Sequence, residues 1–175
     1  MKVQITDYSP VWREMFEREK QLLAAVIKES GSIEHIGSTA VVGLAAKPVI
    51  DILIGLRDFS TASEIVPRIE ALGYKYVPDY EDAMPERRYF KRVSAGVSTH
   101  HIHMVETGGE FWKRHLLFRD FLRANFDAAD EYAALKKNLV AVEWKDKNDY
   151  TEAKTAFIKN IENKAKKLEN ESGAT

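Results

Sequence analysis

A Gly-Ser-Thr turn and a single aspartate on the next apolar run are the residues of this sequence that first suggest chemistry. Gly37, Ser38 and Thr39 follow an apolar run that ends at Ile36, and Asp51 lies within VIDILIGL, which otherwise reads as a buried strand. Such a turn leaves backbone N–H groups unpaired, and its small side chains let a phosphate approach closely. A carboxylate near that phosphate requires a divalent cation between them, and Mg²⁺ is usually held by hard oxygen ligands together with phosphates. The pattern indicates a metal-assisted site for a nucleotide or another phosphate ester.

The same residues also have a structural interpretation. Gly-Ser turns are common connections, and an aspartate near a strand end often serves as a cap or a hydrogen-bonded partner. The residue types at positions 37–39 and 51 do not by themselves separate the two interpretations.

Two histidines on a later strand are candidates to complete the site. His101 and His103 lie two positions apart in STHHIHMVE, so on a strand both side chains point to the same face. An imidazole there could bind a metal ion or accept a proton from a hydroxyl group, and we expect His103 beside Asp51 in one of these roles. The alternative is that both histidines are hydrogen-bonded strand residues.

Basic residues on the preceding strand could bind a polyphosphate. In ERRYFKR either face of the strand presents two cations and one aromatic ring. Arg88 and Lys91 lie on opposite faces and are equivalent candidates, and Lys47 is close to the Gly-Ser turn in sequence. The alternative is an edge strand whose charges prevent aggregation.

The elements that must position these residues follow from hydrophobic periodicity and turn residues. A Ser-Pro start at 9–10 predicts a helix to about residue 28, and a second helix is predicted over 60–72. One helical turn is predicted at 42–46, and the predicted strands cover 32–36, 49–56, 74–79, 87–94 and 98–106. Three further helices are predicted over 110–124, 128–145 and 149–169.

This order of elements predicts an α+β fold, a mixed β-sheet with flanking helices and a C-terminal helical layer. No Pro- or Ser-rich linker divides the chain, so we expect a single domain over 1–175. Its sheet core would cover about 1–107 and its C-terminal helices about 109–170.

The composition excludes several classes of function. The 175 residues carry 26 basic and 27 acidic side chains, a net charge of -1 that gives no global reason to bind nucleic acid or an anionic membrane. There is no cysteine, which excludes disulfides, thiolate metal sites and thiol catalysis. No signal peptide and no apolar run long enough for a membrane span are found, so we expect a cytoplasmic protein. The oligomeric state is not indicated.

The blocks HIGSTAVVGLAAKPVIDILIGL, HIHMVETGGEFWKRHLLFRDFLRANFDAADEYAALKKNL and YTEAKTAFI resemble the GrpB family, also known as UPF0157. This bacterial family is assigned to the nucleotidyltransferase superfamily. Enzymes of this superfamily carry a Gly-Ser or Gly-Gly pair, then a spacer of about a dozen residues, and then two acidic residues on a strand that are separated by one residue. Here twelve residues separate Ser38 from Asp51, but the position of the second acid holds Leu53.

The resemblance implies a nucleotidyltransferase-like fold with a pocket between the 37–39 turn, Asp51 and the 98–106 strand. It implies transfer of a nucleotidyl group from an NTP to an unidentified small-molecule acceptor, with Mg²⁺ on Asp51 and His103 as ligand or base. Leu53 removes one ligand of a two-metal site and favours the alternative, a non-catalytic module that binds a nucleotide or a coenzyme A precursor.

Overall fold

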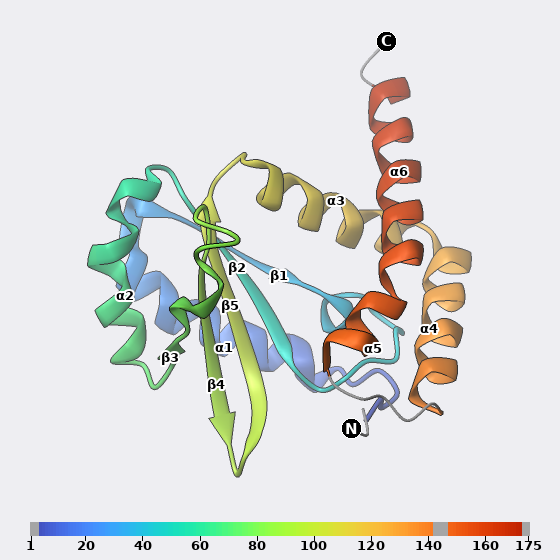
Figure 1. Ribbon diagram of the computed structural model, residues 1–175, viewed down its shortest axis with the longest axis horizontal. Helices are drawn as coiled ribbons and strands as arrows, with labels where there is room; N and C mark the ends of the chain where they lie inside the picture. Colours follow the sequence, from blue (N-terminus) through green and yellow to red (C-terminus); the bar gives the residue numbers. More distant parts are fainter. Residues whose placement is uncertain (1–3, 142–146, 173–175) are drawn as a thin grey trace.

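A five-stranded mixed sheet forms the centre of the computed structural model, which describes residues 4–141 and 147–172 (Figure 1). Its spatial order is β1-β2-β5-β4-β3. The central pair β2 and β5 is parallel, and the other neighbours are antiparallel. The strands are β1 (Gly31–Ile36), β2 (Ile50–Leu56), β3 (Lys75–Tyr76), β4 (Arg88–Ser94) and β5 (Val97–Glu106).

One face of the sheet is covered by α1 (Val11–Ile27) and α2 (Ala62–Glu70). Alternation along the strands points Ile52, Phe90 and Ile102 to this side, where all three are fully buried. They pack with Leu23 of α1 and Ile69 of α2 in the largest apolar cluster of the described chain.

The opposite face is partly covered by α3 (Glu110–Ala124), which packs against the outward side of β1, β2 and β5. The apolar contacts join Leu53 and Val105 to Phe111 and Trp112. A Cβ at Gly55 would lie 2.5 Å from the Trp112 ring, so this strand position admits only glycine while the indole stays where it is. Asp51 and His101 lie on this same face, two positions before Leu53 and His103.

The C-terminal layer comprises α4 (Phe126–Val140), α5 (Lys147–Ala153) and α6 (Thr155–Ser172), with α6 extending away from the sheet (Figure 1). Its cluster contains Leu122, Tyr132 and Ile161. Val41 and Leu44, from the loop between β1 and β2, belong to the same cluster. The loop that follows the Gly-Ser pair is therefore anchored in the helical layer as well as in the sheet.

The predicted order of elements is confirmed, with local corrections. The predicted helix over 149–169 is two helices, α5 and α6, and the helical turn predicted at 42–46 lies earlier, at Ser38–Ala40. The strand predicted over 74–79 is reduced to two residues, because Pro78 has no N–H for a ladder and begins a 3-10 turn. The end of the helix predicted over 128–145 falls on 142–146, outside the described residues.

In the described part of the chain, short 3-10 helices connect the main elements: η1 (Lys28–Ser30), η2 (Ser38–Ala40), η3 (Phe59–Thr61) and η4 (Pro78–Tyr80). None of the helices within residues 4–141 and 147–172 is both long and apolar enough to cross a membrane.

Candidate functional site

The Gly-Ser turn and the lone carboxylate are in direct contact. β1 and β2 pair Ile36 with Asp51, so the chain turns at Gly37 beside the aspartate. Gly37 has φ +74°, and a Cβ there would lie 2.6 Å from Asp51 Oδ2. Glycine is therefore required both by the backbone conformation and by the approach of the carboxylate. The Asp51 side chain keeps 30% of its surface exposed, so the carboxylate is not sealed in the core.

Asp51 forms a hydrogen-bonded pair with His101, its register partner on β5. The Nδ1–H of His101 donates to Asp51 Oδ1 at 3.1 Å. Burial alone would raise the pKa of Asp51, but the hydrogen bond and charge of His101, with smaller effects from His103 and His35, hold that pKa below its ordinary value. The carboxylate is therefore ionised at neutral pH.

This pairing fixes the tautomer of a neutral His101. With the proton on Nδ1, Nε2 carries a lone pair. Nε2 is buried and has no hydrogen-bond partner, which is unusual for a polar atom in a protein interior. Our expectation that His103 lies beside Asp51 needs correction, because the parallel register places His101 there and pairs His103 with Leu53.

His103 lies in an aromatic environment. Arg87 Nη1 donates to His103 Nδ1 at 3.3 Å, and the imidazole packs against the rings of Tyr89 and Phe111. Burial lowers the pKa of His103 to about 3, with Asp51 opposing and nearby His115 and Arg87 adding to the shift. His103 is therefore neutral at pH 7, with its proton on Nε2.

A lysine that we did not predict reaches the Gly-Ser turn from α4. Lys136 is 2% exposed, and its ammonium donates to Ser38 Oγ at 3.0 Å and to the Ala45 carbonyl. It also lies 4.5 Å from the centre of the Tyr132 ring. Burial, and to a lesser extent the charge of Lys154, lowers the pKa of Lys136 to about 7. No ion pair joins Lys136 to a carboxylate in the described part of the chain.

The sequence contains one signal for Lys136. It follows Ala129 and Tyr132 at spacings of seven and four, so a lysine occupies the buried stripe of an amphipathic helix. A lysine at such a position is a candidate for a functional role, because its charge must be compensated or its pKa lowered.

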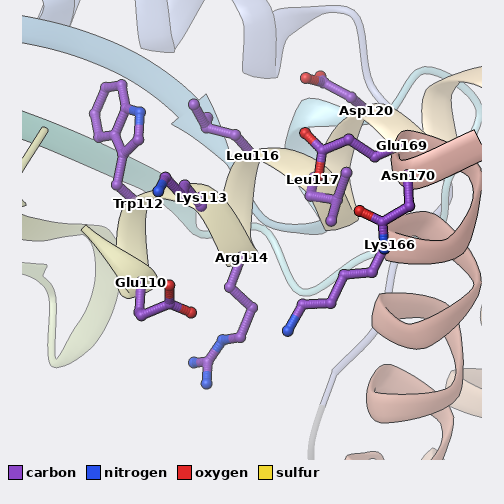
Figure 2. A pocket seen from close by; sticks show the side chains of 10 residues that line it. All are labelled: Glu110, Trp112, Lys113, Arg114, Leu116, Leu117, Asp120, Lys166, Glu169 and Asn170. Carbon is purple, nitrogen blue, oxygen red and sulfur yellow. The ribbon is translucent and has the colours of Figure 1, made fainter. Parts of the chain in front are cut away.

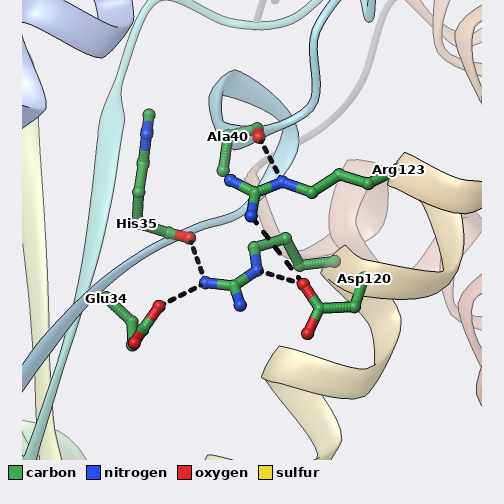
Figure 3. A network of polar contacts seen from close by, with 6 residues as sticks. Glu34, His35, Ala40, Asp120 and Arg123 are labelled. Carbon is green, nitrogen blue, oxygen red and sulfur yellow. Dashed lines mark hydrogen bonds and ion pairs between the residues drawn. The ribbon is translucent and has the colours of Figure 1, made fainter.

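Hydrogen bonds from both sides hold the turn itself. The Thr39 hydroxyl donates to the Val49 carbonyl at 3.2 Å and accepts from His35 Nε2 at 3.0 Å. Arg123 Nε donates to the Ala40 carbonyl at 2.9 Å. Figure 3 shows this side chain reaching from α3 to the turn. In the same network Arg119 donates to the His35 carbonyl on β1.

The remaining predicted residues are separated by the fold. Arg88 pairs with Met104, whose side chain lies in the cluster under α1 and α2, so Arg88 lies on the opposite face from Asp51. Lys91 pairs with His101 and therefore shares the Asp51 face, and Lys47 is exposed. Arg87 was not predicted, although it precedes Tyr89 and Lys91 on this face.

No group of three or more His, Asp or Glu side chains within residues 4–141 and 147–172 is arranged to hold a metal ion. Asp51 supplies a partly exposed carboxylate beside the turn. The arrangement therefore offers the carboxylate of Asp51 as a hard oxygen ligand, the buried ammonium of Lys136 hydrogen-bonded to Ser38, and the lone pair of His101 Nε2.

Comparisons with known proteins match these features to a family. Residues 2–164 match the family model described as GrpB protein. The UPF0157 protein YqkA of Bacillus subtilis is 42% identical over 167 residues, which cover 95% of this chain and 48% of YqkA. The chain thus spans about half the length of that relative. A crystal structure of conserved protein GrpB from Enterococcus faecalis is 38% identical with a TM-score of 0.85, covering 94% of this chain and 98% of that one.

Two more distant similarities bear on fold and on domain context. The Cid1 poly(U) polymerase, solved with Mg 3'-dATP bound, has a TM-score of 0.53 at 12% identity, covering 77% of this chain and 43% of Cid1. Identity this low shows the fold alone, and the expected nucleotidyltransferase-like α+β fold is confirmed. A dephospho-CoA kinase from Mycolicibacterium paratuberculosis is 28% identical over 159 residues, covering 78% of this chain and 39% of the kinase.

Proposed function

Because this chain belongs to the GrpB family and has a nucleotidyltransferase-like fold, we propose that it transfers a nucleotidyl group from a nucleoside triphosphate to a small-molecule hydroxyl or amine. The observation that carries this proposal is the convergence of three groups on one turn. Asp51 touches Gly37, Lys136 donates to Ser38, and His101 is hydrogen-bonded to Asp51.

The phosphates of the nucleotide bind at Ser38 and Lys136. A buried ammonium that forms no ion pair among the described residues is destabilising until an anion compensates its charge. A phosphate at Ser38 supplies that charge and accepts hydrogen bonds from both side chains. Arg87, which contacts His103, and Lys91, which pairs with His101, supply further cations on the Asp51 face of the sheet.

One Mg²⁺ fits the ligands that are present. Asp51 is ionised and partly exposed, and Mg²⁺ is commonly held by one or two carboxylates together with substrate phosphates. When bound there, the ion would offset the charge that develops on the phosphates during transfer. Leu53 is fully buried in place of the second acid, so a second ion lacks its carboxylate.

His101 is the proton acceptor that the hydrogen bonds favour over His103. Its Nε2 lone pair is unused, whereas Nδ1 of His103 already accepts from Arg87. In the proposed step the acceptor oxygen or nitrogen forms a bond to the α-phosphorus and the bond to pyrophosphate breaks. The proton lost by the acceptor goes to His101 Nε2, and pyrophosphate leaves with the bonding electrons. Nε2 is buried, so the acceptor must displace neighbouring side chains to reach it.

A non-catalytic binding module is the second candidate, and the burial of Leu53 favours it. The same phosphate contacts at Ser38 and Lys136 would then bind a nucleotide or a coenzyme A precursor without transfer. The similarity to a dephospho-CoA kinase supports a coenzyme A precursor as the ligand.

Calorimetry with nucleoside triphosphates and coenzyme A precursors, with and without Mg²⁺, tests the proposal. We expect Mg²⁺ to strengthen triphosphate binding in the wild type but not in Asp51→Asn. Lys136→Met should weaken binding about tenfold or more with or without metal, because a charge-assisted hydrogen bond is worth roughly 1.5–3 kcal/mol. Lys137→Met, on the same helix but exposed and paired with Asp7, is the matched control and should bind as the wild type.

Pyrophosphate release in the presence of candidate acceptors separates transfer from binding. Tight binding without release would support the binding module. The absence of thermal stabilisation by every nucleotide and precursor at about 1 mM would contradict both candidates, since a ligand at 100 times its Kd stabilises by about 2.7 kcal/mol.

A further inference from the structure

A cavity lies beside α1, and Asp51 is not among its lining residues. It has a volume of about 560 Å³ and is lined by residues of α1, the 39–42 loop and the junction of α3 and α4. From its charges, its polar floor and its apolar rim we infer that this cavity binds a small organic acid. The ligand carries a carboxylate or phosphate, a flat apolar body and a hydrogen-bond donor. This inference does not depend on nucleotidyl transfer.

The charge of the cavity is positive. Arg13 of α1 and Arg123 of α3 both line it, and Glu17 is the one acidic residue among its described lining residues. Neither arginine forms an ion pair with Glu17 among the described residues. Arg123 also lies 3.8 Å from Asp120 Oδ1, and burial, with Arg119 and Arg13 contributing and Asp120 and Glu34 opposing, lowers the pKa of its guanidinium. The lining itself holds two guanidinium groups and one carboxylate, so an anion between Arg13 and Arg123 offsets the excess positive charge and matches the geometry of guanidinium groups.

A cavity of similar size elsewhere provides the contrast. The hollow of about 480 Å³ between α3 and α6 is lined by three basic and three acidic residues, whose charges balance. Figure 2 shows acidic Glu110, Asp120 and Glu169 interspersed with basic Lys113, Arg114 and Lys166. That hollow has no net preference for an anion.

The floor of the α1 cavity offers an acceptor that the protein does not use. His35 and Thr39 line the cavity and are 6% and 3% exposed. The Thr39 hydroxyl has one proton and donates it to the Val49 carbonyl, so it must accept from His35 Nε2–H. Burial, with Arg123 and Arg119 contributing and Asp51 opposing, lowers the pKa of His35 to about 4, which keeps the ring neutral. Nδ1 of His35 is thereby left as an acceptor for a hydroxyl or amine.

The rim of the cavity is apolar and exposed. Phe126 is 76% exposed and Val42 is 71% exposed, the two highest values among the exposed large hydrophobic side chains of the described chain. Both line the cavity, as do the rings of Tyr8 and Phe16. A flat apolar body is the group that such a rim would cover.

The test uses 4-hydroxyphenylacetate, which has a carboxylate, a ring and a hydroxyl donor, in an NMR titration of the labelled protein. We expect saturable binding with a Kd of about 1 mM, an affinity that a molecule of this size can reach, and changes in the resonances of His35 and Phe126. Phenylacetate lacks the donor, 4-hydroxyphenethyl alcohol lacks the charge, and acetate lacks the ring. Each of these three should bind at least threefold more weakly.

Substitutions test whether the probe binds in the cavity beside α1. Arg13→Gln should weaken binding at least tenfold, and Arg123→Gln provides a second measurement at the other guanidinium. Arg114→Gln, in the hollow between α3 and α6, is the matched control and should bind as the wild type.

Three results would overturn the inference. The first is the absence of NMR shift changes at the cavity residues up to about 10 mM probe, which would mean binding weaker than the millimolar Kd of weak ligands. The second is equal weakening by Arg13→Gln and Arg114→Gln. The third is displacement of the probe by a nucleoside triphosphate competing for the same residues, which would make this cavity part of the nucleotide site. Failure here leaves the calorimetry on Asp51 and Lys136 unaffected.

Discussion

Replacement of Lys136 by methionine should change how stability depends on pH. Lys136 is 2% exposed, and burial lowers its pKa from 10.5 to about 7. Because that pKa is lower in the folded chain than in the unfolded chain, the unfolded chain binds more protons between about pH 7 and pH 10.5. The free energy of unfolding therefore rises with pH across this window, and the stability is lost as pH falls.

The magnitude follows from the size of the shift. A difference of about 3.5 pKa units corresponds to about 5 kcal/mol over the whole window, at 1.36 kcal/mol per unit. Between pH 7.5 and pH 9 the folded lysine is mostly neutral and the unfolded one is charged, so this segment contributes about 2 kcal/mol. Methionine has a similar length and no charge, so the variant lacks this contribution. The lost hydrogen bonds to Ser38 and Ala45 add a constant offset that does not depend on pH.

Urea unfolding of both proteins at pH 7.5, 8 and 9 provides the measurement. The stability of the wild type relative to Lys136→Met should increase by about 2 kcal/mol across the series. Taking the difference cancels groups that titrate alike in both proteins.

Parallel pH profiles for the two proteins would refute the reasoning, because they would show that the Lys136 ammonium is solvated or paired in the folded chain. Inorganic triphosphate adds a further check. If it binds at Ser38 it should raise the pKa of Lys136 and flatten the wild-type profile, leaving Lys136→Met unchanged.

Two further substitutions probe the turn and the edge of the sheet. Gly37→Ala should lower the free energy of unfolding by about 2–3 kcal/mol and move the NMR resonances of His101, because φ is +74° and the new Cβ would meet the Asp51 carboxylate. Gly43→Ala is the control: its φ is also positive, at +81°, but no atom lies within 4 Å of the new Cβ, so the His101 resonances should stay where they are. Arg119→Met should cost about 2 kcal/mol, because it removes the hydrogen bond to the His35 carbonyl of β1 and the ion pairs with Glu34 and Asp120. Arg114→Met removes an ion pair between α3 and Glu162 of α6 in which the arginine is half exposed, so it should cost less than about 1 kcal/mol; equal losses in urea unfolding would contradict this.

Local features of the sequence were sufficient for much of the architecture. The strand that carries Asp51 was predicted from its apolar run, and the strand that carries His101 from a segment rich in aromatic and β-branched residues between turn residues, because these signals act over a few positions. The alternation of side chains along a strand placed His101 and His103 on one face, which the register with β2 confirms. The Gly37 turn was predicted from residue type alone, and its positive φ supplies the reason.

Relations between distant elements could not be predicted from the same features. Whether His101 or His103 lies opposite Asp51 depends on the register of a parallel pair of strands, which packing of Leu53 and Val105 under α3 helps to set. The sequence could not show whether Arg88 or Lys91 lies on the Asp51 face, because the two faces of a strand are equivalent until its neighbours are known. Lys136 was missed because it meets Ser38 only through the packing of α4 against the 37–46 loop.

The contact between Lys136 and Ser38 spans 98 positions of the chain, whereas the pairing of Ile36 with Asp51 spans only a short loop. During synthesis the two strands that place Asp51 beside Gly37 are therefore complete long before Lys136 of α4 leaves the ribosome. The competence of Ser38 to share an anion with a buried ammonium can appear only after α4 has been made, and local opening of the helical layer would be enough to remove it.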